Sequence, residues 1–253
     1  MTCEVGVLFT PAEYRGGRTD DLSDTTCVVF DILRATSTMV TALAAGATGL
    51  LPVGEISEAL EYRRQQPDVL LAGERGGQRI GAALTGGREF ELGNSPREFT
   101  PARVAGKFIV TTTTNGTRAL RACAGAEEVV VGSFLNLSAT ARHLGSRPRN
   151  RICLVCAGTG EETALEDLLA AGALCEQLQV TGPTLAFRDS AVIARGAFLQ
   201  ARANLADAVG QSRNARHLLR LPELQEDVGF CLRLDAFDLV AVSDAEKVVR
   251  RRS

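Results

Sequence analysis

The first group of side chains able to do chemistry follows the apolar run 27–30. Asp31, Arg34, Thr36 and Ser37 occur within seven residues of one another. A carboxylate can hold a hard divalent cation, an arginine can bind phosphate through two hydrogen bonds, and the start of a helix offers free backbone N–H groups to an anion. The same residues could instead form an Asp31–Arg34 ion pair and a hydroxyl cap on the helix. Taken alone, this group fits both interpretations.

A second pair of loops supplies an acid, an arginine and an amide. Glu74, Arg75 and Gly76 come directly after the apolar run 69–72, and the glycine allows the backbone to approach a ligand closely. Asn94 lies in a long, polar, glycine-rich stretch, and such stretches inside compact domains are often functional. A turn with an incidental ion pair is the alternative interpretation.

Four consecutive threonines, 111–114, form the third group together with the Asn-Gly pair that follows them. We expect Thr113, Thr114, Asn115 and Gly116 to lie where a strand gives way to a helix. Hydroxyls, an amide and backbone N–H groups could together bind a phosphate or a sulfonate without any net charge. Alternatively, some of these residues simply end the strand or cap the helix.

The fourth group begins with Gly158 and Thr159 after the apolar run 152–156. It nearly matches the Gly-x-Gly-x-x-Gly dinucleotide motif, but Thr163 replaces the last glycine and no acidic residue closes a convincing second strand further on. Glu166 and Asp167 could hold a metal ion or its water ligands. Acidic residues early in a helix also simply suit the helix dipole.

The spacing of residues excludes several standard mechanisms. A cysteine phosphatase needs an arginine six positions after its cysteine, and no cysteine here has one. The common haloacid-type mechanism needs a second aspartate two positions after the first, but Asp31 is followed there by Leu33, and nucleotide hydrolysis is unsupported because residues 49–55 lack the lysine of a Walker A motif. His143 and His217 have no zinc-ligand or triad spacing. Metal-assisted attack of water on a phosphate monoester remains.

The end of the sequence carries two charged groups to which we assign no catalytic role. Glu226, Asp227 and Asp235 are acidic residues that we interpret as surface or helix-cap positions. The basic run 250–252 is interpreted as a solvated, frayed tail.

The elements that must position these groups form a repeated strand–helix pattern. Strands are predicted at 4–9, 27–30, 50–53, 69–72, 108–111, 129–132, 152–156 and 239–242, and helices at 38–45, 55–66, 118–123, 165–178 and over most of 189–221. Runs such as 27–30 are apolar throughout, which indicates burial on both faces of a sheet. The pattern predicts a three-layer α/β/α fold with a mainly parallel or mixed sheet, as one unit over 1–253 or as two similar α/β lobes with a boundary near 100–150. In such folds ligands bind beyond the carboxyl ends of the strands, where these polar groups lie.

The composition of the sequence limits the classes of binding partner and the cellular location that we expect. The 253 residues carry 28 Lys and Arg against 30 Asp and Glu, a formal net charge of −2, so we expect no nucleic-acid or membrane partner. Seven cysteines, several of them in apolar segments, are typical of free thiols in a reducing cytoplasm. No secretory signal is visible, and the longest apolar stretch, 39–54, is too short to cross a bilayer comfortably. We expect a cytoplasmic protein, and a homo-oligomer stays open.

Taken together and in order, these motifs resemble the 2-phosphosulfolactate phosphatase family. The resemblance rests on residues 31–38, 73–77, 92–96, 112–118, 132–136, 156–159, 165–169, 226–227 and 230–231. It covers nearly the whole chain, from residue 5 to about residue 242.

The resemblance implies an α/β fold of its own type, Mg²⁺ dependence, and hydrolysis of (2R)-2-phospho-3-sulfolactate to sulfolactate and phosphate on the route to coenzyme M. The motifs and the resemblance together give three sets of candidate residues. The catalytic set is Asp31, Arg34, Glu74 and Arg75; the substrate-binding set is Thr36, Ser37, Gly76, Asn94, Thr113, Thr114, Asn115, Gly116, Gly158 and Thr159; the metal set is Asp31, Glu166 and Asp167.

Two segments depart from the family pattern. Residues 160–164 lack the aromatic and serine that relatives more often have there, and residues 82–88 are additional. These departures leave a related 2-hydroxy acid phosphate open as the substrate. A dinucleotide-dependent oxidoreductase and a non-catalytic small-anion-binding protein of the same fold are the alternative functions.

Overall fold

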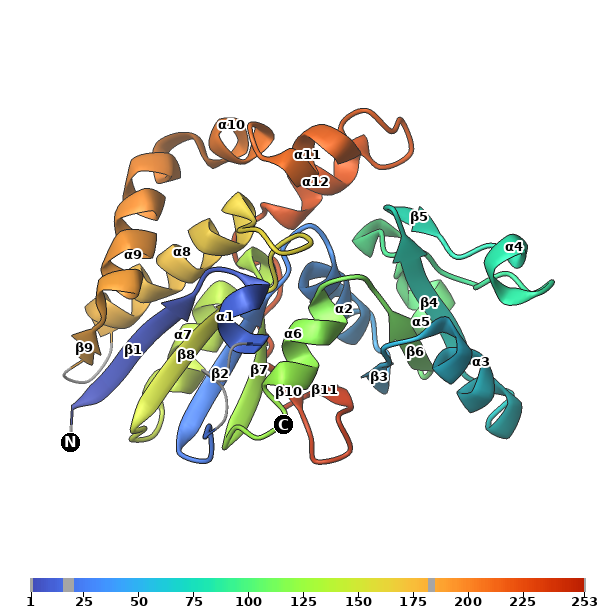
Figure 1. The fold of residues 1–253 in the computed structure, drawn as a ribbon, viewed down its shortest axis with the longest axis horizontal. Helices are drawn as coiled ribbons and strands as arrows, with labels where there is room; N and C mark the ends of the chain where they lie inside the picture. Colours follow the sequence, from blue (N-terminus) through green and yellow to red (C-terminus); the bar gives the residue numbers. More distant parts are fainter. Residues whose placement is uncertain (1, 16–20, 182–184, 253) are drawn as a thin grey trace.

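The computed structural model describes residues 2–15, 21–181 and 185–252. Within them, one mixed sheet runs in the order β5-β4-β6-β3-β11-β10-β7-β2-β8-β1-β9 (Figure 1). The strands are β1 (Cys3–Leu8), β2 (Thr25–Phe30), β3 (Gly49–Pro52), β4 (Leu70–Arg75), β5 (Gln78–Arg79), β6 (Phe108–Thr112), β7 (Glu128–Gly132), β8 (Arg151–Cys156), β9 (Leu185–Phe187), β10 (Ala241–Ser243) and β11 (Val249–Arg251).

The helices flank this sheet. They are α1 (Pro11–Arg15), α2 (Ala35–Ala44), α3 (Ile56–Gln65), α4 (Ala82–Thr85), α5 (Pro101–Val104), α6 (Gly116–Ala122), α7 (Leu137–Gly145), α8 (Leu165–Thr181), α9 (Asp189–Ala201), α10 (Leu205–Gly210), α11 (Arg213–Leu218) and α12 (Gln225–Cys231), with 3₁₀ turns η1 (Pro96–Glu98), η2 (Phe134–Asn136) and η3 (Arg202–Asn204). The predicted α/β class with a mixed sheet flanked by helices is confirmed. The short strands β5, β9 and β11 were not predicted.

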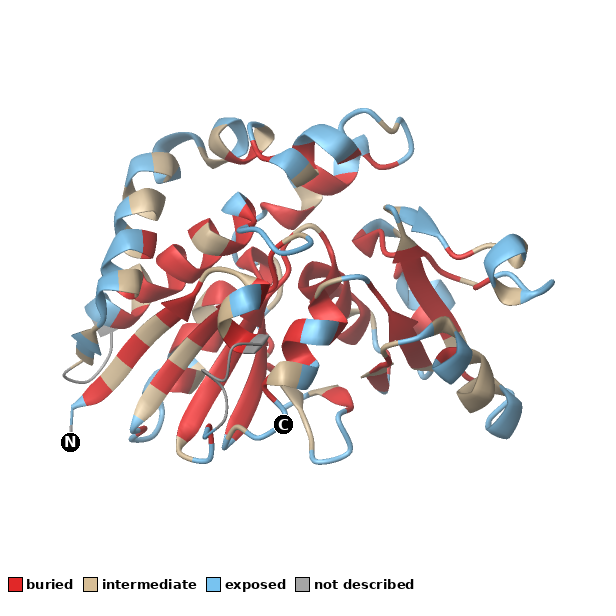
Figure 2. Cartoon of the chain, in the orientation of Figure 1, coloured by how far each residue is buried: buried red, intermediate tan, exposed pale blue. Residues whose placement is uncertain are grey.

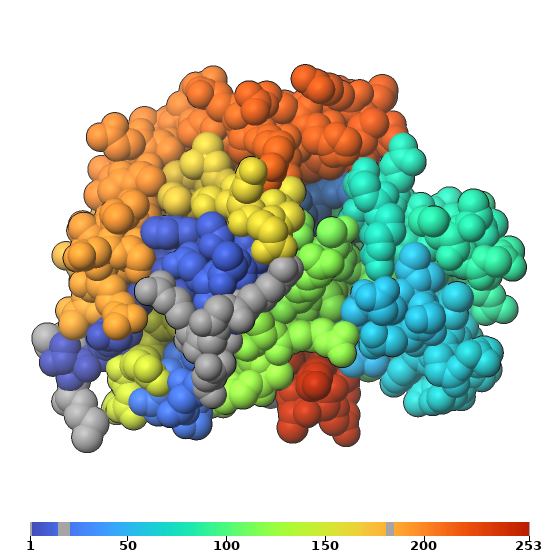
Figure 3. Space-filling model, in the orientation of Figure 1, coloured from blue at the N-terminus to red at the C-terminus, as the bar shows by residue number. Residues whose placement is uncertain are grey.

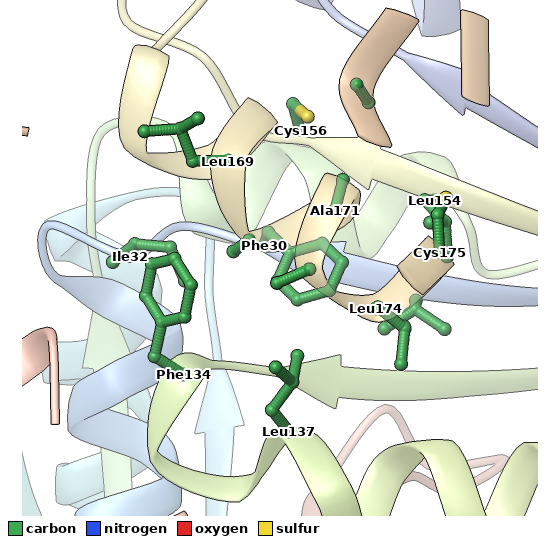
Figure 4. Packing of buried hydrophobic residues seen from close by; sticks show 14 of the residues in the cluster. Phe30, Ile32, Phe134, Leu137, Leu154, Cys156, Leu169, Ala171, Leu174 and Cys175 are labelled. Carbon is green, nitrogen blue, oxygen red and sulfur yellow. The ribbon is translucent and has the colours of Figure 1, made fainter. Parts of the chain in front are cut away.

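The central strand β2 shows why helices cover both faces. All of its residues are buried; Val28 and Phe30 pack in one core cluster, and Cys27 and Val29 pack in another. Because successive strand side chains point to opposite faces, each face needs its own cover of helices. Figure 4 shows Phe30 and Phe134 in the first cluster, beside side chains of α8. In Figure 2 the strands are mainly buried, whereas the outer faces of the helices are exposed.

Two parallel sets of strands are joined by the hairpin of β10 and β11. One set is β7, β2, β8, β1 and β9, and the other is β3, β6 and β4. β10 pairs antiparallel with β7, and β11 pairs antiparallel with β3 through Val249 and Leu50. The interpretation of residues 250–252 as a frayed tail is therefore wrong: Arg250 lies in β11 and donates from Nε to Asp244 at 2.9 Å.

The helical segment predicted at 189–221 forms α9, α10 and α11, and α12 follows it. Figure 1 shows α10, α11 and α12 crossing above the end of the sheet toward which β1 and β8 point. In the space-filling view this orange-to-red segment lies against the yellow residues after β8 and meets the teal residues around β5 (Figure 3). The segment therefore covers strand ends that carry the polar groups.

All seven cysteines are free, as predicted, and only Cys153 is half-buried instead of buried. Cys27 and Cys153 face each other on the neighbouring strands β2 and β8. Among the described residues, no helix is long and apolar enough to span a membrane.

Candidate active site

One pocket of about 410 Å³ gathers loops from across the chain. Its walls come from the segments after β2, β4, β6 and β8 and from α11. The lining residues are Asp31, Leu33, Arg34, Glu74, Gly76, Gly77, Asn94, Thr113, Thr114, Asn115, Gly158, Thr159, Glu166, Asp167, Arg213, Asn214, His217 and Leu218. All four groups singled out in the sequence therefore contribute to the same pocket.

Asp31 leaves β2 and enters a loop that is closed by hydroxyl groups. Its carboxylate accepts a hydrogen bond from the N–H of Ala35 at 3.0 Å. The Thr36 hydroxyl accepts from the N–H of Asp31 and donates to its carbonyl, both at 3.0 Å, and the Ser37 hydroxyl donates to the carbonyl of Ile32 at 2.9 Å. Thr36 and Ser37 are thus buried loop-forming residues and do not line the pocket.

The environment of Asp31 disfavours its negative charge. Burial raises the pKa of Asp31 to about 7, against the hydrogen bond from Ala35, and the nearby charges of Glu74 and Glu166 raise it further. A carboxylate in this setting needs a proton or a cation beside it.

Asp167 joins the first and fourth loops. Its Oδ1 accepts from the N–H of Ile32 at 2.8 Å and its Oδ2 from the N–H of Gly158 at 3.1 Å. Burial, followed by repulsion from Asp31 and Glu166, raises the pKa of Asp167 well above its usual range. The side chain therefore fixes the two loops and adds a buried carboxyl group to the pocket.

Glu166 is nearly fully buried in the first turn of α8. Its Oε1 accepts from Asn214 Nδ2 at 2.6 Å, whereas its buried Oε2 has no hydrogen-bond partner within the described residues. An unpartnered buried carboxylate oxygen is costly unless a ligand or ion binds it.

Arg34 is held by the far end of the chain. Its Nη1 donates to Asp227 Oδ2 and its Nη2 donates to the carbonyl of Gly77, each at 2.7 Å. Ser95 donates to the other oxygen of Asp227 at 2.7 Å. The partner of Arg34 is thus Asp227 and not Asp31, and the interpretation of Asp227 as a surface or cap residue is wrong, because its side chain is fully buried.

Glu74 connects the second and third loops. Its Oε1 accepts from both the N–H and the hydroxyl of Thr114 at 3.0 Å, and its Oε2 accepts from the N–H of Gly77 at 2.8 Å. Arg75 points elsewhere: its guanidinium donates to the Thr112 hydroxyl at 3.1 Å and to the Glu74 carbonyl at 2.7 Å, and it does not line the pocket. Gly76 does line the pocket and has a φ of 61°, which favours glycine.

The amides and the third loop complete the wall. Asn94, Thr113 and Asn115 line the pocket, and the buried Oδ1 of Asn115 has no partner within the described part of the chain. Gly116 does not line it, but a Cβ there would lie 2.8 Å from Asp31 Oδ2. The glycine therefore allows α6 to start close against Asp31.

Sequence reasoning missed the contribution of α11. Asn214 Nδ2 donates to Thr159 Oγ1 at 2.7 Å as well as to Glu166. Arg213 Nη2 donates to the Thr159 carbonyl at 2.9 Å, and His217 Nε2 lies 3.4 Å from the Gly76 carbonyl. No local motif marks these residues, since only the path of the helical segment brings them to the pocket.

The chemistry of this wall fits a hard divalent cation. Four carboxylates line the pocket against two guanidinium groups, Arg34 and Arg213, and Arg34 is already paired with Asp227. The predicted metal ligands Asp31, Glu166 and Asp167 all line it. In the described ranges, however, no three His, Cys, Asp or Glu side chains already form a metal-binding cluster. Oxygen donors, uncompensated charge and the free Glu166 Oε2 suit Mg²⁺.

The fold and the pocket define an α/β protein whose strand-end loops combine buried carboxylates with a fixed arginine. The family model for 2-phosphosulpholactate phosphatase matches residues 10–246. The chain belongs to this family.

Relatives align along most of their length. Proteins named "probable 2-phosphosulfolactate phosphatase" include one from Caldanaerobacter subterraneus subsp. tengcongensis, 39% identical over 92% of this chain and 93% of the relative. The protein of that name from Symbiobacterium thermophilum is 39% identical over 96% and 98%. The one from Thermotoga petrophila is 41% identical over 85% and 87%.

Proposed function

We propose that this protein is a Mg²⁺-dependent phosphatase that hydrolyses 2-phospho-3-sulfolactate or a related 2-hydroxy acid phosphate to the hydroxy acid and inorganic phosphate. The names of its relatives support the reaction. The observation that carries the proposal is that buried carboxylates and the fixed guanidinium of Arg34 line one pocket. Phosphoryl transfer needs these two features, a cation site and a hydrogen-bond donor for the phosphoryl oxygens.

In this proposal Asp31, Glu166 and Asp167 hold the ion. When bound, Mg²⁺ neutralises charge on phosphoryl oxygens and makes bound water easier to deprotonate. Arg34 has N–H groups left to donate to the phosphoryl oxygens, because Asp227 and Gly77 occupy two of its five N–H donors. Glu74 keeps the Thr114 loop in place.

The polar neutral residues then orient the rest of the substrate. Asn94 and Asn115 offer amide groups to the substrate carboxylate from the pocket wall, and the Thr114 hydroxyl lies on the same wall. Thr36 and Ser37 act indirectly, through the shape of the loop that carries Asp31 and Arg34.

The structure gives a physical argument against the dinucleotide alternative. In a Gly-x-Gly-x-x-Gly motif the backbone N–H groups must be open to pyrophosphate. Here the N–H of Gly158 donates to Asp167, a carboxylate that occupies the place of an anion.

The proposal includes two further expectations. Residues 1–253 act as one unit, and the protein is cytoplasmic, which its seven free thiols support.

The test is release of inorganic phosphate from phosphosulfolactate, with Mg²⁺ or with EDTA. We expect turnover with Mg²⁺, loss of turnover in EDTA, and a reduction of about 100-fold or more in Asp31→Asn. Asp68→Asn, at an exposed position, is the matched control and should keep wild-type rates. A folded wild type that binds sulfolactate but releases no phosphate would instead support the non-catalytic anion-binding function.

A further inference from the structure

The two arginines of the pocket differ in how they are held. The Arg34 side chain is 3% exposed and its partner Asp227 is fully buried. The Arg213 side chain is 50% exposed, and its Nη1 lies 2.7 Å from Oε2 of Glu162, which is 74% exposed. An ion pair between two exposed side chains contributes little, whereas a buried pair is costly to separate. Arg213 can therefore exchange Glu162 for an anionic ligand, and Arg34 cannot leave Asp227 as easily.

The backbone that carries Arg213 is fixed in place. Ser212 caps α11 by accepting from the N–H of Ala215 at 3.1 Å. Asn214, the next residue, donates to both Thr159 and Glu166, and on the following turn His217 Nε2 lies 3.4 Å from the Gly76 carbonyl. The Cα of Arg213 is thus anchored beside the carboxylate wall, and only its guanidinium has freedom to change partners.

Charge balance gives the exchangeable guanidinium a role. A phosphorylated 2-hydroxy acid that has an acidic group on carbon 3, in addition to its own carboxylate, carries one more negative charge than 2-phospholactate, in which carbon 3 is a methyl group. Among the described lining residues, Arg213 is the one arginine whose partner is an exposed carboxylate. Arg34 is assigned to the phosphoryl oxygens, and the other polar lining groups are carboxylates, neutral amides, hydroxyls and His217.

We propose that Arg213 selects substrates that carry a second acidic group, a sulfonate or a carboxylate, on carbon 3, and that Glu162 pairs with Arg213 until such a substrate binds. The inference rests on the proposed function and names the substrate group that Arg213 of α11 recognises.

The experiment compares three esters in the presence of Mg²⁺. Phosphosulfolactate has a sulfonate on carbon 3, 2-phosphomalate has a carboxylate there, and in 2-phospholactate carbon 3 is a methyl group. Arg213→Gln should lower kcat/KM for one or both of the acidic esters by about 10- to 100-fold, as expected for one charge-assisted contact, and leave 2-phospholactate within about 3-fold. Which acidic ester falls identifies the group. Glu162→Gln should raise kcat/KM for the same ester a few-fold.

Arg216→Gln is the matched control, because Arg216 is exposed on the same helix and does not line the pocket. An equal loss for all three esters, or no loss for any of them, would overturn the assignment of Arg213. Calorimetric binding of sulfolactate, malate and lactate separates this inference from the proposed function. If Arg213→Gln weakens binding of sulfolactate or malate while the wild type releases no phosphate, the phosphatase proposal fails and the role of Arg213 in binding stands. If the variant binds both sulfolactate and malate as well as the wild type does, the inference fails whatever the turnover.

Discussion

Arg34 and Asp227 form a buried ion pair at 2.7 Å although 193 residues separate them along the chain. The pair connects the loop after β2 to α12, and Ser95 adds a third segment by donating to the same carboxylate. The geometry of the proposed phosphate-binding arginine is therefore set by the C-terminal helical segment as much as by its own loop.

Removing Asp227 should affect both stability and substrate affinity. Asp227→Ala leaves Arg34 buried without a counter-charge, which is expected to lower the free energy of unfolding by about 3–5 kcal/mol. Because Arg34 then loses its orientation, kcat/KM should fall by about 100-fold. Urea unfolding and phosphate release measure the two effects. Glu226→Gln, next to it in sequence but 66% exposed, should change neither, and equal stabilities of the two variants would contradict the role of Asp227.

Gly116 should tolerate no side chain. A Cβ would lie 2.7 Å from the Cβ of Ala35 and 2.8 Å from Asp31 Oδ2, so Gly116→Ala must push α6 away from Asp31. We expect a loss of about 1–3 kcal/mol in stability and at least a 10-fold loss in kcat. Gly196→Ala in α9, where a Cβ meets nothing within 4 Å, is the control and should be neutral or slightly stabilising. Full activity of Gly116→Ala would show that the close contact is not needed.

Because the pocket carboxylates repel one another, Glu166→Gln should raise the Tm in the absence of metal but reduce the increase in Tm that Mg²⁺ causes. In EDTA this variant should have a higher Tm than the wild type, because one of the charges facing Asp31 and Asp167 is removed. Saturating Mg²⁺ should raise the Tm of the wild type, by the equivalent of about 2.7 kcal/mol at 100 times Kd, and raise that of the variant much less. Thermal unfolding of the wild type, of Glu166→Gln and of the exposed control variant Glu55→Gln tests this prediction. An equal increase in Tm on addition of Mg²⁺ in all three proteins would remove Glu166 from the metal set.

Acid stability should depend on Glu128 at the start of β7. Burial alone would raise the pKa of Glu128, but hydrogen bonds from His143 and Arg149 outweigh it and lower the pKa from 4.5 to about 2. The stabilisation is therefore fully present above pH 4.5 and is lost as the pH falls toward 2, on the order of 3 kcal/mol in total. Urea midpoints measured across this range should fall less steeply for Glu128→Gln than for the wild type. The neighbouring, half-exposed Glu127 provides the control variant Glu127→Gln, which should follow the wild-type curve.

The sequence predicted the strands with continuous apolar runs because their signal is local. The run 27–30 falls within β2, and the residue that follows it, Asp31, lies at the carboxyl end where α/β folds bind ligands. Strand periodicity also contained a signal that the prediction of Arg75 did not use. Successive side chains of β4 point to opposite faces, so Glu74 in the pocket places Arg75 away from it.

Asp227 and Arg213 could not be found in this way. Both depend on where a helical segment far along the chain passes, and short polar helices of six or seven residues carry no pattern that fixes their path. Their hydrogen-bond partners, Arg34 and Thr159, belong to loops much earlier in the sequence. Tertiary placement decides such contacts, and a single sequence contains little trace of it.

The hairpin of β10 and β11 has a consequence for how the protein is made. It lies between β7 and β3 in the sheet, yet among the described strands it is the last in the sequence. On the ribosome, both parallel sets of strands emerge before the hairpin that joins them. Until residues 241–251 leave the exit tunnel, the nascent chain has two strand edges, at β3 and at β7, that are open in addition to those at β5 and β9, and these are the places where a chaperone would protect it from pairing with another chain.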